Sequence, residues 1–218
     1  MKNIGIIGAM NIEIEKLVEA LNLNKKKGIK DIYIGTYKDK NIFLINGGIG
    51  KVNSALSTQY LIDKYKIDAI IHTGCAGSLD KSLSLLELVI VDTVTYHDFI
   101  PTRVMKEYVP EEGIMKASDE LINKFILIIP NNIKYRIGKI ATGDCFVTEE
   151  DYRDKIKTET GAICVDMESA SIAHVAKVNN IPFINIRTIS DFADGIDDFE
   201  KEASYQSSFL VKKYLDIL

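Results

Sequence analysis

The sequence lacks a set of cysteines that could stabilise a small fold through disulfide bonds or a bound metal ion. Its cysteines are Cys75, Cys145 and Cys164, which lie far apart and form no C-x-x-C pair. They also share no ligand spacing with the three histidines, which argues against disulfides and against a structural zinc site. We therefore expect neither a metal site nor a cofactor.

Long apolar runs and a charge excess are also missing. No segment approaches the roughly 18 consecutive apolar residues of a membrane span, and the apolar run near the first residue is too short for a signal peptide. The 27 Lys plus Arg nearly balance the 31 Asp plus Glu, for a net charge of −4. This balance gives no electrostatic reason to expect a nucleic acid or an anionic membrane as partner. We expect a cytoplasmic location.

Three common catalytic motifs are absent in their complete form. Residues 46–52 (NGGIGKV) are similar to a P-loop, but Ile45 replaces its first glycine and Val52 replaces the hydroxyl residue that binds magnesium. Residues 5–10 (GIIGAM) do not match the dinucleotide fingerprint G-x-G-x-x-G, and no G-x-S-x-G elbow occurs. These gaps argue against a kinase, a dehydrogenase and an esterase.

Short apolar runs alternate with amphipathic stretches along the 218 residues. This alternation predicts one α/β domain over residues 1–218, with a largely parallel or mixed central sheet. Strands are predicted near residues 4–7, 32–37, 42–45, 68–72, 88–94, 137–141 and 183–189, and helices near residues 14–21, 52–59, 167–178 and 199–215. Residues 99–136 are the least regular, and we expect loops around one helix there, as a candidate cover for the active site.

Glycines and acidic residues follow five of the predicted strands. The ends concerned are residues 8–10, 46–50, 73–77, 142–146 and 190–194. Ligands of open α/β sheets bind at the carboxyl ends of strands, so we expect these five ends to face one way and to outline a pocket.

Four segments in order carry a family resemblance. They are GIIGAM (residues 5–10) with Glu13 behind it, GIGKV (48–52), VDMESA (165–170) continuing into IAHV (172–175), and RTISDFAD (187–194), with support from TGCAG (73–77) and YHD (96–98). Each motif is weak alone, but in this order and spacing the chain resembles the methylthioadenosine/adenosylhomocysteine nucleosidases. The resemblance covers nearly the whole chain except about residues 99–136.

The resemblance implies a three-layer α/β/α nucleoside phosphorylase-like fold and a homodimer whose pocket is lined partly by the partner chain. It also implies roles for individual residues by position. Asp191 would be the general acid toward purine N7, and Glu13 the base that activates water. Glu168 would hold the ribose hydroxyls, Met167 would lie under the sugar, Phe146 would stack on the purine, the Val147 backbone would contact its edge, and Arg187 and Ser190 would support the water and the acid.

The residue types suit the chemistry independently of the family. Cleavage of a ribosyl C–N bond builds positive charge on the sugar, as in other glycosyl hydrolyses. A buried carboxylic acid can protonate the leaving purine, a second carboxylate can deprotonate water, and a third can accept hydrogen bonds from two hydroxyls. General acid and base catalysis each contribute about 10²–10⁴-fold.

Each residue also has a plainer local interpretation. Glu13 suits the first turn of a helix, and Asp191 after a strand suits a helix N-cap. Met167 and Phe146 suit core packing. Arg187 lies in an apolar strand, where an unpaired charge is costly, so we expect it to meet a carboxylate. His97 and Asp98 suit the orientation of a loop, outside the catalytic set.

The chain departs from the family where specificity is decided. Cys75 replaces a common serine and Cys145 a small residue, and a thiol is a weak hydrogen-bond donor. Pro101 and Val104 occupy a loop that usually supplies apolar contacts to the 5′ substituent. Ile49, Met10 and Phe199 are the remaining candidates for that apolar wall.

Three rival functions remain open at this stage. A purine nucleoside phosphorylase needs arginines at the glycine-rich loops, where only Lys51 is cationic. A nucleosidase for another adenosine, such as aminodeoxyfutalosine or plain adenosine, differs only at the 5′ group. A nucleoside sensor without catalysis is the third, and the presence of all three carboxylates argues against it.

Overall fold

The computed structural model describes residues 1–28, 30–194 and 199–218. Its strands are β1 (Asn3–Gly8), β2 (Asn24–Lys26), β3 (Ile32–Tyr37), β4 (Lys40–Asn46), β5 (Ala69–Ser78), β6 (Leu88–Tyr96), β7 (Met115–Lys116), β8 (Tyr135–Thr142), β9 (Cys164–Asp166) and β10 (Phe183–Asp191). Its helices are α1 (Asn11–Ala20), α2 (Lys51–Tyr65), α3 (Thr102–Tyr108), α4 (Asp119–Ile126), α5 (Glu150–Thr160), α6 (Ser169–Val178) and α7 (Glu200–Leu215), with a 3-10 turn at Pro110–Gly113.

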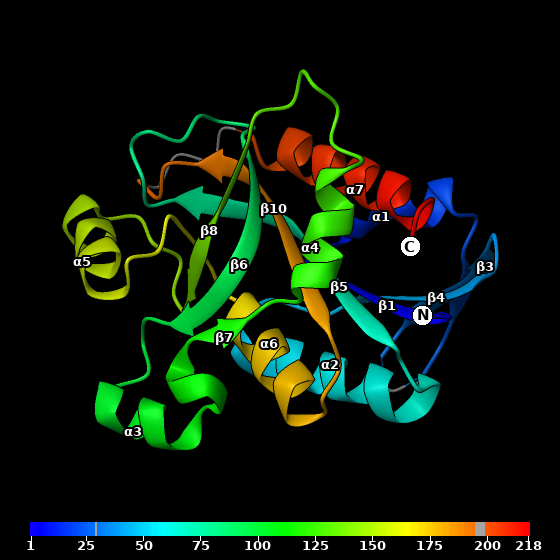
Figure 1. The fold of residues 1–218 in the computed structure, drawn as a ribbon, viewed down its shortest axis with the longest axis horizontal. Helices are drawn as coiled ribbons and strands as arrows, with labels where there is room; N and C mark the ends of the chain where they lie inside the picture. The colour runs from blue at the N-terminus through cyan, green and yellow to red at the C-terminus, as the bar shows by residue number, and fades with distance from the viewer. Residues whose placement is uncertain (29, 195–198) are drawn as a thin grey trace.

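One mixed sheet runs through the molecule in the order β10-β6-β8-β9-β5-β1-β4-β3-β2. Strand β5 pairs in parallel with both β1 and β10, and antiparallel with β9. Because β10 also pairs with β6, the five strands β5, β10, β6, β8 and β9 close into a ring, while β1 to β4 extend the sheet on one side (Figure 1).

Helices cover the sheet on both faces, which confirms the predicted three layers (Figure 1). Helices α1 and α7 pack together, with α7 against β5 and β10. Helices α2 and α6 pack together on the other side, α2 against β1 and α6 against β6 and β8. The central strands are therefore apolar on both faces, with Ile4, Ile6, Ile71 and Ile184 fully buried.

The prediction for residues 99–136 is wrong in two respects. The segment contains two helices and a short strand, because Leu121, Ile122 and Phe125 of α4 bury one face and Ser118 caps that helix, while Met105 of α3 is also buried. It also does not cover the active site, since none of its residues lines the cavity described below.

The expectation that five strand ends face one way is wrong for β8. Strands β1, β4, β5 and β10 run in parallel, but β8 is parallel to β6, which is antiparallel to β10. The residues after β8 still reach the pocket, because β9 joins β8 to β5 and the ring brings opposite strand ends together.

Helix α2 forms where predicted, but its apolar residues face outward. Val52 is 78% exposed and Leu56 is also exposed. The buried face instead carries Leu61 together with Ser54, Ser57 and Thr58. The three hydroxyl groups donate hydrogen bonds to backbone carbonyls. An exposed pair of apolar side chains one turn apart is a feature of interaction surfaces.

Candidate active site

A cavity of about 750 Å³, including its open mouth, lies where β1, β5, β9 and β10 end. That size suits a small organic ligand. Its wall holds the predicted site residues other than Arg187 and Phe199. The described lining residues are Ala9, Met10, Glu13, Ile49, Cys75, Ala76, Gly77, Cys145, Phe146, Val147, Val165, Asp166, Met167, Glu168, Ser190, Asp191, Ala193 and Glu200.

Glu13 is buried in the first turn of α1, and its carboxylate is fixed by backbone donors. Oε2 accepts the N–H groups of Ala9 (2.6 Å) and Met10 (3.0 Å), and Oε1 accepts that of Cys75 (3.1 Å). The predicted first-turn position of Glu13 is confirmed, and the same side chain lines the cavity. Gly74 has a φ of +153°, and a Cβ there would meet Glu13 Oε1 and Arg187 Nη1.

Asp191 ends β10 beside a register shift between Ile189 and Asp191. A bulge of this kind re-aims a side chain at a strand end. Ser190 Oγ donates to Asp191 Oδ2 (2.7 Å), and the Ala193 N–H donates to Oδ1 (2.8 Å). The carboxyl group is buried and held by both donors on the cavity wall.

Glu168 lies just before α6 and is buried. Its Oε1 accepts the Gly50 N–H at 2.9 Å, which joins the glycine-rich loop before α2 to the start of α6. Burial, and then the negative charge of Asp166, raise the pKa of Glu168 to about 8. The protonated form is therefore favoured at neutral pH, and hydrogen bonds donated to this group would favour the charged form.

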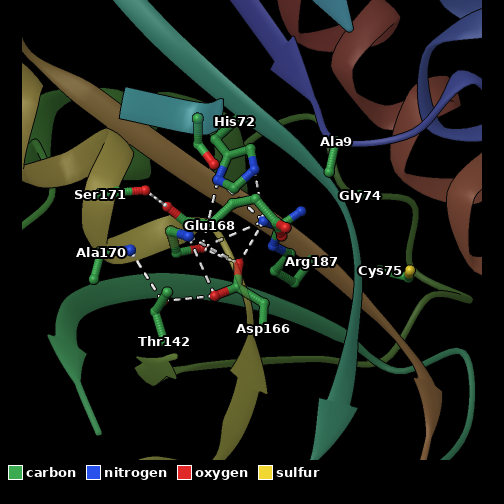
Figure 2. Close-up of polar contacts among 12 residues, drawn as sticks. Ala9, His72, Gly74, Cys75, Thr142, Asp166, Glu168, Ala170, Ser171 and Arg187 are labelled. Atoms are coloured by element: carbon green, nitrogen blue, oxygen red, sulfur yellow. Dashed lines mark hydrogen bonds and ion pairs between the residues drawn. The ribbon is translucent and has the colours of Figure 1, made fainter. Parts of the chain in front are cut away.

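Arg187 is fully buried in β10 and does not line the cavity. Figure 2 shows its contacts with Asp166 and His72. Arg187 Nη2 contacts Asp166 Oδ2 at 2.6 Å and donates to His72 Nε2, also at 2.6 Å. Thr142 Oγ1 donates to Asp166 Oδ1 (2.6 Å). Burial and the charge of Arg187 hold the pKa of His72 well below its ordinary value, so the ring is neutral and can accept. The prediction that Arg187 meets a carboxylate is confirmed.

Comparison with known proteins agrees with this geometry. The family model for the phosphorylase superfamily matches residues 3–215. A 5′-methylthioadenosine/S-adenosylhomocysteine nucleosidase of Staphylococcus aureus is 38% identical over 216 residues, or 96% of this chain and 92% of the relative. The chain belongs to the phosphorylase superfamily. Within it, the chain is a member of the methylthioadenosine/adenosylhomocysteine nucleosidase family, as its motifs predict.

Solved structures place the nucleosidase fold over the entire chain. A nucleosidase of that name from Helicobacter pylori, complexed with a pyrrolopyrimidine compound, superposes with a TM-score of 0.92 at 30% identity, covering 100% of this chain and 99% of the other. An adenosylhomocysteine nucleosidase from Streptococcus pyogenes gives 0.92 at 31% identity, covering 100% and 97%. A futalosine hydrolase of Helicobacter pylori gives 0.92 at 28% identity, covering 100% and 98%.

Cys75 lies next to Glu13 in the cavity wall. Its Sγ lies 3.7 Å from Glu13 Oε1, a contact for a weak thiol donor. Burial, and then the charge of Glu13, raise the pKa of the thiol well above its ordinary value. The side chain is therefore a neutral thiol.

The predicted apolar walls differ in exposure. Val147 is buried, whereas Phe146 is 60% and Ile49 is 51% exposed at the mouth of the cavity. Phe199 is the residue before α7 and does not line the cavity within the described chain. Its neighbour Glu200 does, so this segment borders the site but presents a carboxylate to it.

Sequence reasoning missed Asp166 and His72 as parts of the site. Arg187 signalled that a carboxylate must lie close by, and the run VDME (165–168) follows an apolar strand. The signal did not say which acid pairs with Arg187, because that choice depends on the meeting of β5, β9 and β10.

No metal site or membrane span occurs in the part of the chain that the structure describes. Across residues 1–28, 30–194 and 199–218, no three His, Cys, Asp or Glu side chains are placed to hold a metal ion. Among the same residues, no helix has the length and apolar character to cross a membrane.

Proposed function

We propose that this enzyme hydrolyses the N-glycosidic bond of 5′-methylthioadenosine and S-adenosylhomocysteine, with release of adenine and the thioribose product. The observation that carries the proposal is the convergence of Glu13, Glu168 and Asp191 on one cavity, each held by hydrogen bonds. The curated relatives with this activity in their name cover almost the whole chain.

The proposed mechanism uses the three carboxyl groups for different tasks. Asp191 donates its proton to purine N7, while Glu13 takes a proton from water. The water oxygen bonds to C1′ as the C1′–N9 bond breaks, so adenine leaves as a neutral molecule. Glu168 accepts hydrogen bonds from the two ribose hydroxyl groups. These hydrogen bonds favour the charged form of the carboxyl group when the substrate is bound. Negative charge on the carboxylates near the sugar stabilises the positive charge that develops there in the transition state, which raises the rate.

The other lining residues are proposed to bind and orient the nucleoside. Phe146 stacks on the purine, the Val147 backbone contacts its edge, and Met167 lies under the sugar. Met10 and Ile49 face the 5′ substituent. Two predicted residues act from outside the wall: Arg187 supports the water through its place beside Glu13, and Phe199 would reach the 5′ group only by a movement of the start of α7.

Hydrolysis is favoured over phosphorolysis by the charge of the wall. Among the described lining residues there is no lysine or arginine, so phosphate would find no cation at the surface of the cavity. Arg187 lies below the wall and already pairs with Asp166.

A second candidate substrate is aminodeoxyfutalosine or another 5′-substituted adenosine. The likeness to the futalosine hydrolase of Helicobacter pylori, at a TM-score of 0.92 and 28% identity, favours this alternative. It requires the same bond cleavage and differs only in the group at the 5′ position.

The deciding experiment measures adenine release by the purified protein from methylthioadenosine, with and without phosphate. Release without phosphate is the expected result, and relative rates with adenosylhomocysteine, aminodeoxyfutalosine and adenosine then rank the substrates. Release that requires phosphate would make the enzyme a phosphorylase. Binding of these nucleosides without turnover would make it a sensor.

We also propose that residues 1–218 form one domain and that two copies form a homodimer in the cytoplasm. Strand β10 completes the sheet beside β5, and α7 packs on α1, so early and late segments share one core. Ile49 and Phe146 are exposed and line the cavity, and Val52 and Leu56 are exposed on α2, which starts two residues after Ile49. These apolar side chains suit a second copy that completes the site. Three free cysteines suit a reducing compartment.

A further inference from the structure

Two loops flank the cavity, and each carries one side of the proposed site. The first loop, residues 48–51, includes Ile49 and donates the Gly50 N–H to Glu168. The second loop, residues 143–147, carries Cys145, Phe146 and Val147. Their spacing therefore sets the distance between the sugar side and the base side of the cavity.

The start of α2 depends on the second loop for its cap. Gly50 precedes the helix and has no side chain to cap it. Asp144 supplies the missing acceptor from across the gap, because its Oδ1 accepts the Lys51 N–H at 2.8 Å. A carboxylate at this end of a helix is also favoured by the helix dipole.

Asp98 joins the two loops at a single oxygen. Its Oδ2 accepts the Asp144 N–H at 2.8 Å and the Lys51 ammonium at 2.6 Å. The Lys51 ammonium is also 3.7 Å from Asp144 Oδ2. The side chains of Lys51 and Asp98 are partly buried, so their ion pair is less screened than a surface pair. Burial raises the pKa of Asp98, but its bonds to Lys51 and Asp144 outweigh burial and leave it below the ordinary value.

The second loop has a further fixed point below Asp144. The His97 ring fills the space that a side chain at Gly143 would need. His97 Nδ1 lies 3.2 Å from the Tyr152 hydroxyl on α5. His97 therefore fixes the position of the start of the second loop. The contacts of Asp98 then set the position of the loop relative to α2.

We propose that Asp98 and Lys51 are positioning residues that hold the two loops at the spacing required for Phe146 and Glu168 to bind one nucleoside. Neither residue lines the described cavity, so their action passes through the loops. The roles of Phe146 and Glu168 in binding rest on the proposed function. The loop contacts themselves do not.

The test compares Asp98→Asn with the wild type and with Asp92→Asn. Asp92 lies on β6, which ends two residues before Asp98, and among its described side-chain contacts it bonds only to the adjacent Thr93 hydroxyl. Loss of a charge-assisted hydrogen bond corresponds to about a tenfold change in binding. We expect KM for methylthioadenosine to rise about tenfold in Asp98→Asn while kcat changes less than about twofold. Asp92→Asn keeps both constants.

A second measurement needs no substrate and separates this proposal from the proposed function. Cys145 lies in the second loop and is partly exposed, whereas Cys164 is buried and serves as an internal reference. Release of the loop in Asp98→Asn should increase alkylation of Cys145 by iodoacetamide, measured by peptide mass spectrometry. A wild type that cleaves no nucleoside would overturn the proposed function and leave this result intact.

Lys51→Met provides the independent variant if Asp98→Asn does not fold. It should give the same rise in KM and in Cys145 alkylation, and the double variant should be no worse than either single one. Unchanged alkylation and KM in a folded Asp98→Asn or Lys51→Met protein would overturn the proposal. A fall in kcat at unchanged KM would do so as well.

Discussion

At the scale of single residues, Asp191 carries the largest expected effect on turnover. Asparagine preserves the shape of the side chain and an oxygen for the Ala193 N–H. It cannot give a proton to the purine. In Asp191→Asn we expect kcat to fall by about 10²–10⁴-fold and the melting temperature to stay near that of the wild type. Adenine release and calorimetry measure these quantities, and near-normal turnover would remove Asp191 as the general acid.

Glu168 should make stability depend on pH in a defined direction. Its pKa is raised from 4.5 to about 8 in the folded chain. The folded state therefore binds more protons than the unfolded state between these values, and the stability from protonated Glu168 is lost as the pH rises through about 8. Melting temperatures from pH 5 to 9 should fall more steeply for the wild type than for Glu168→Gln. Parallel curves would contradict the raised pKa.

At the scale of elements, the space beside Gly74 in β5 is already filled by Glu13 and Arg187. The methyl group of Gly74→Ala must displace the Glu13 carboxylate, so we expect at least a tenfold loss of kcat/KM and a destabilisation of about 1–3 kcal/mol from overpacking. The assay and urea denaturation measure the two effects.

Gly161→Ala is the matched control for that substitution. Gly161 also has a positive φ, of 67°, but a Cβ there meets only the end of Lys139 at 4.0 Å. The control should lose about 1–2 kcal/mol through backbone strain alone and keep its kcat/KM. Equal losses of activity in both variants would show that strain, and not displacement of Glu13, is responsible.

The elements that were predicted correctly are those with local signals. The strands at β1, β3, β4 and β10 and the helix α7 follow from apolar periodicity, and the glycines and acids after strands indicated most of the cavity wall. The direction of β8 and the closing of the strand ring depend on pairings between distant segments, which periodicity does not encode. The same holds for the choice of Asp166 and His72 as partners of Arg187.

At the scale of the whole molecule, the outward face of α2 makes a prediction about assembly. Val52→Glu places a charge in the proposed contact, while an acid near the start of a helix is favourable for the helix itself. We expect the wild type to show twice the chain mass of 24.4 kDa by light scattering, and Val52→Glu to show one chain mass. Adenine release should fall with the loss of the partner.

Leu127→Glu is the control for that variant, because Leu127 is as exposed as Val52 but follows α4. It should remain a dimer with wild-type activity. A wild-type mass of one chain at all concentrations would refute the proposed dimer, and an active monomeric Val52→Glu would show that one chain completes the site.

The ring of β5, β10, β6, β8 and β9 also determines when the active site can fold during synthesis on the ribosome. Ile70 of β5 pairs with Phe183 of β10, and the Gly74 carbonyl accepts a hydrogen bond from Ser207 in α7. A nascent chain that has released Glu13 but not yet the last segments has no wall opposite that carboxylate. The cavity is therefore complete only when the last segments have been synthesised. We expect truncated chains to cleave no nucleosides.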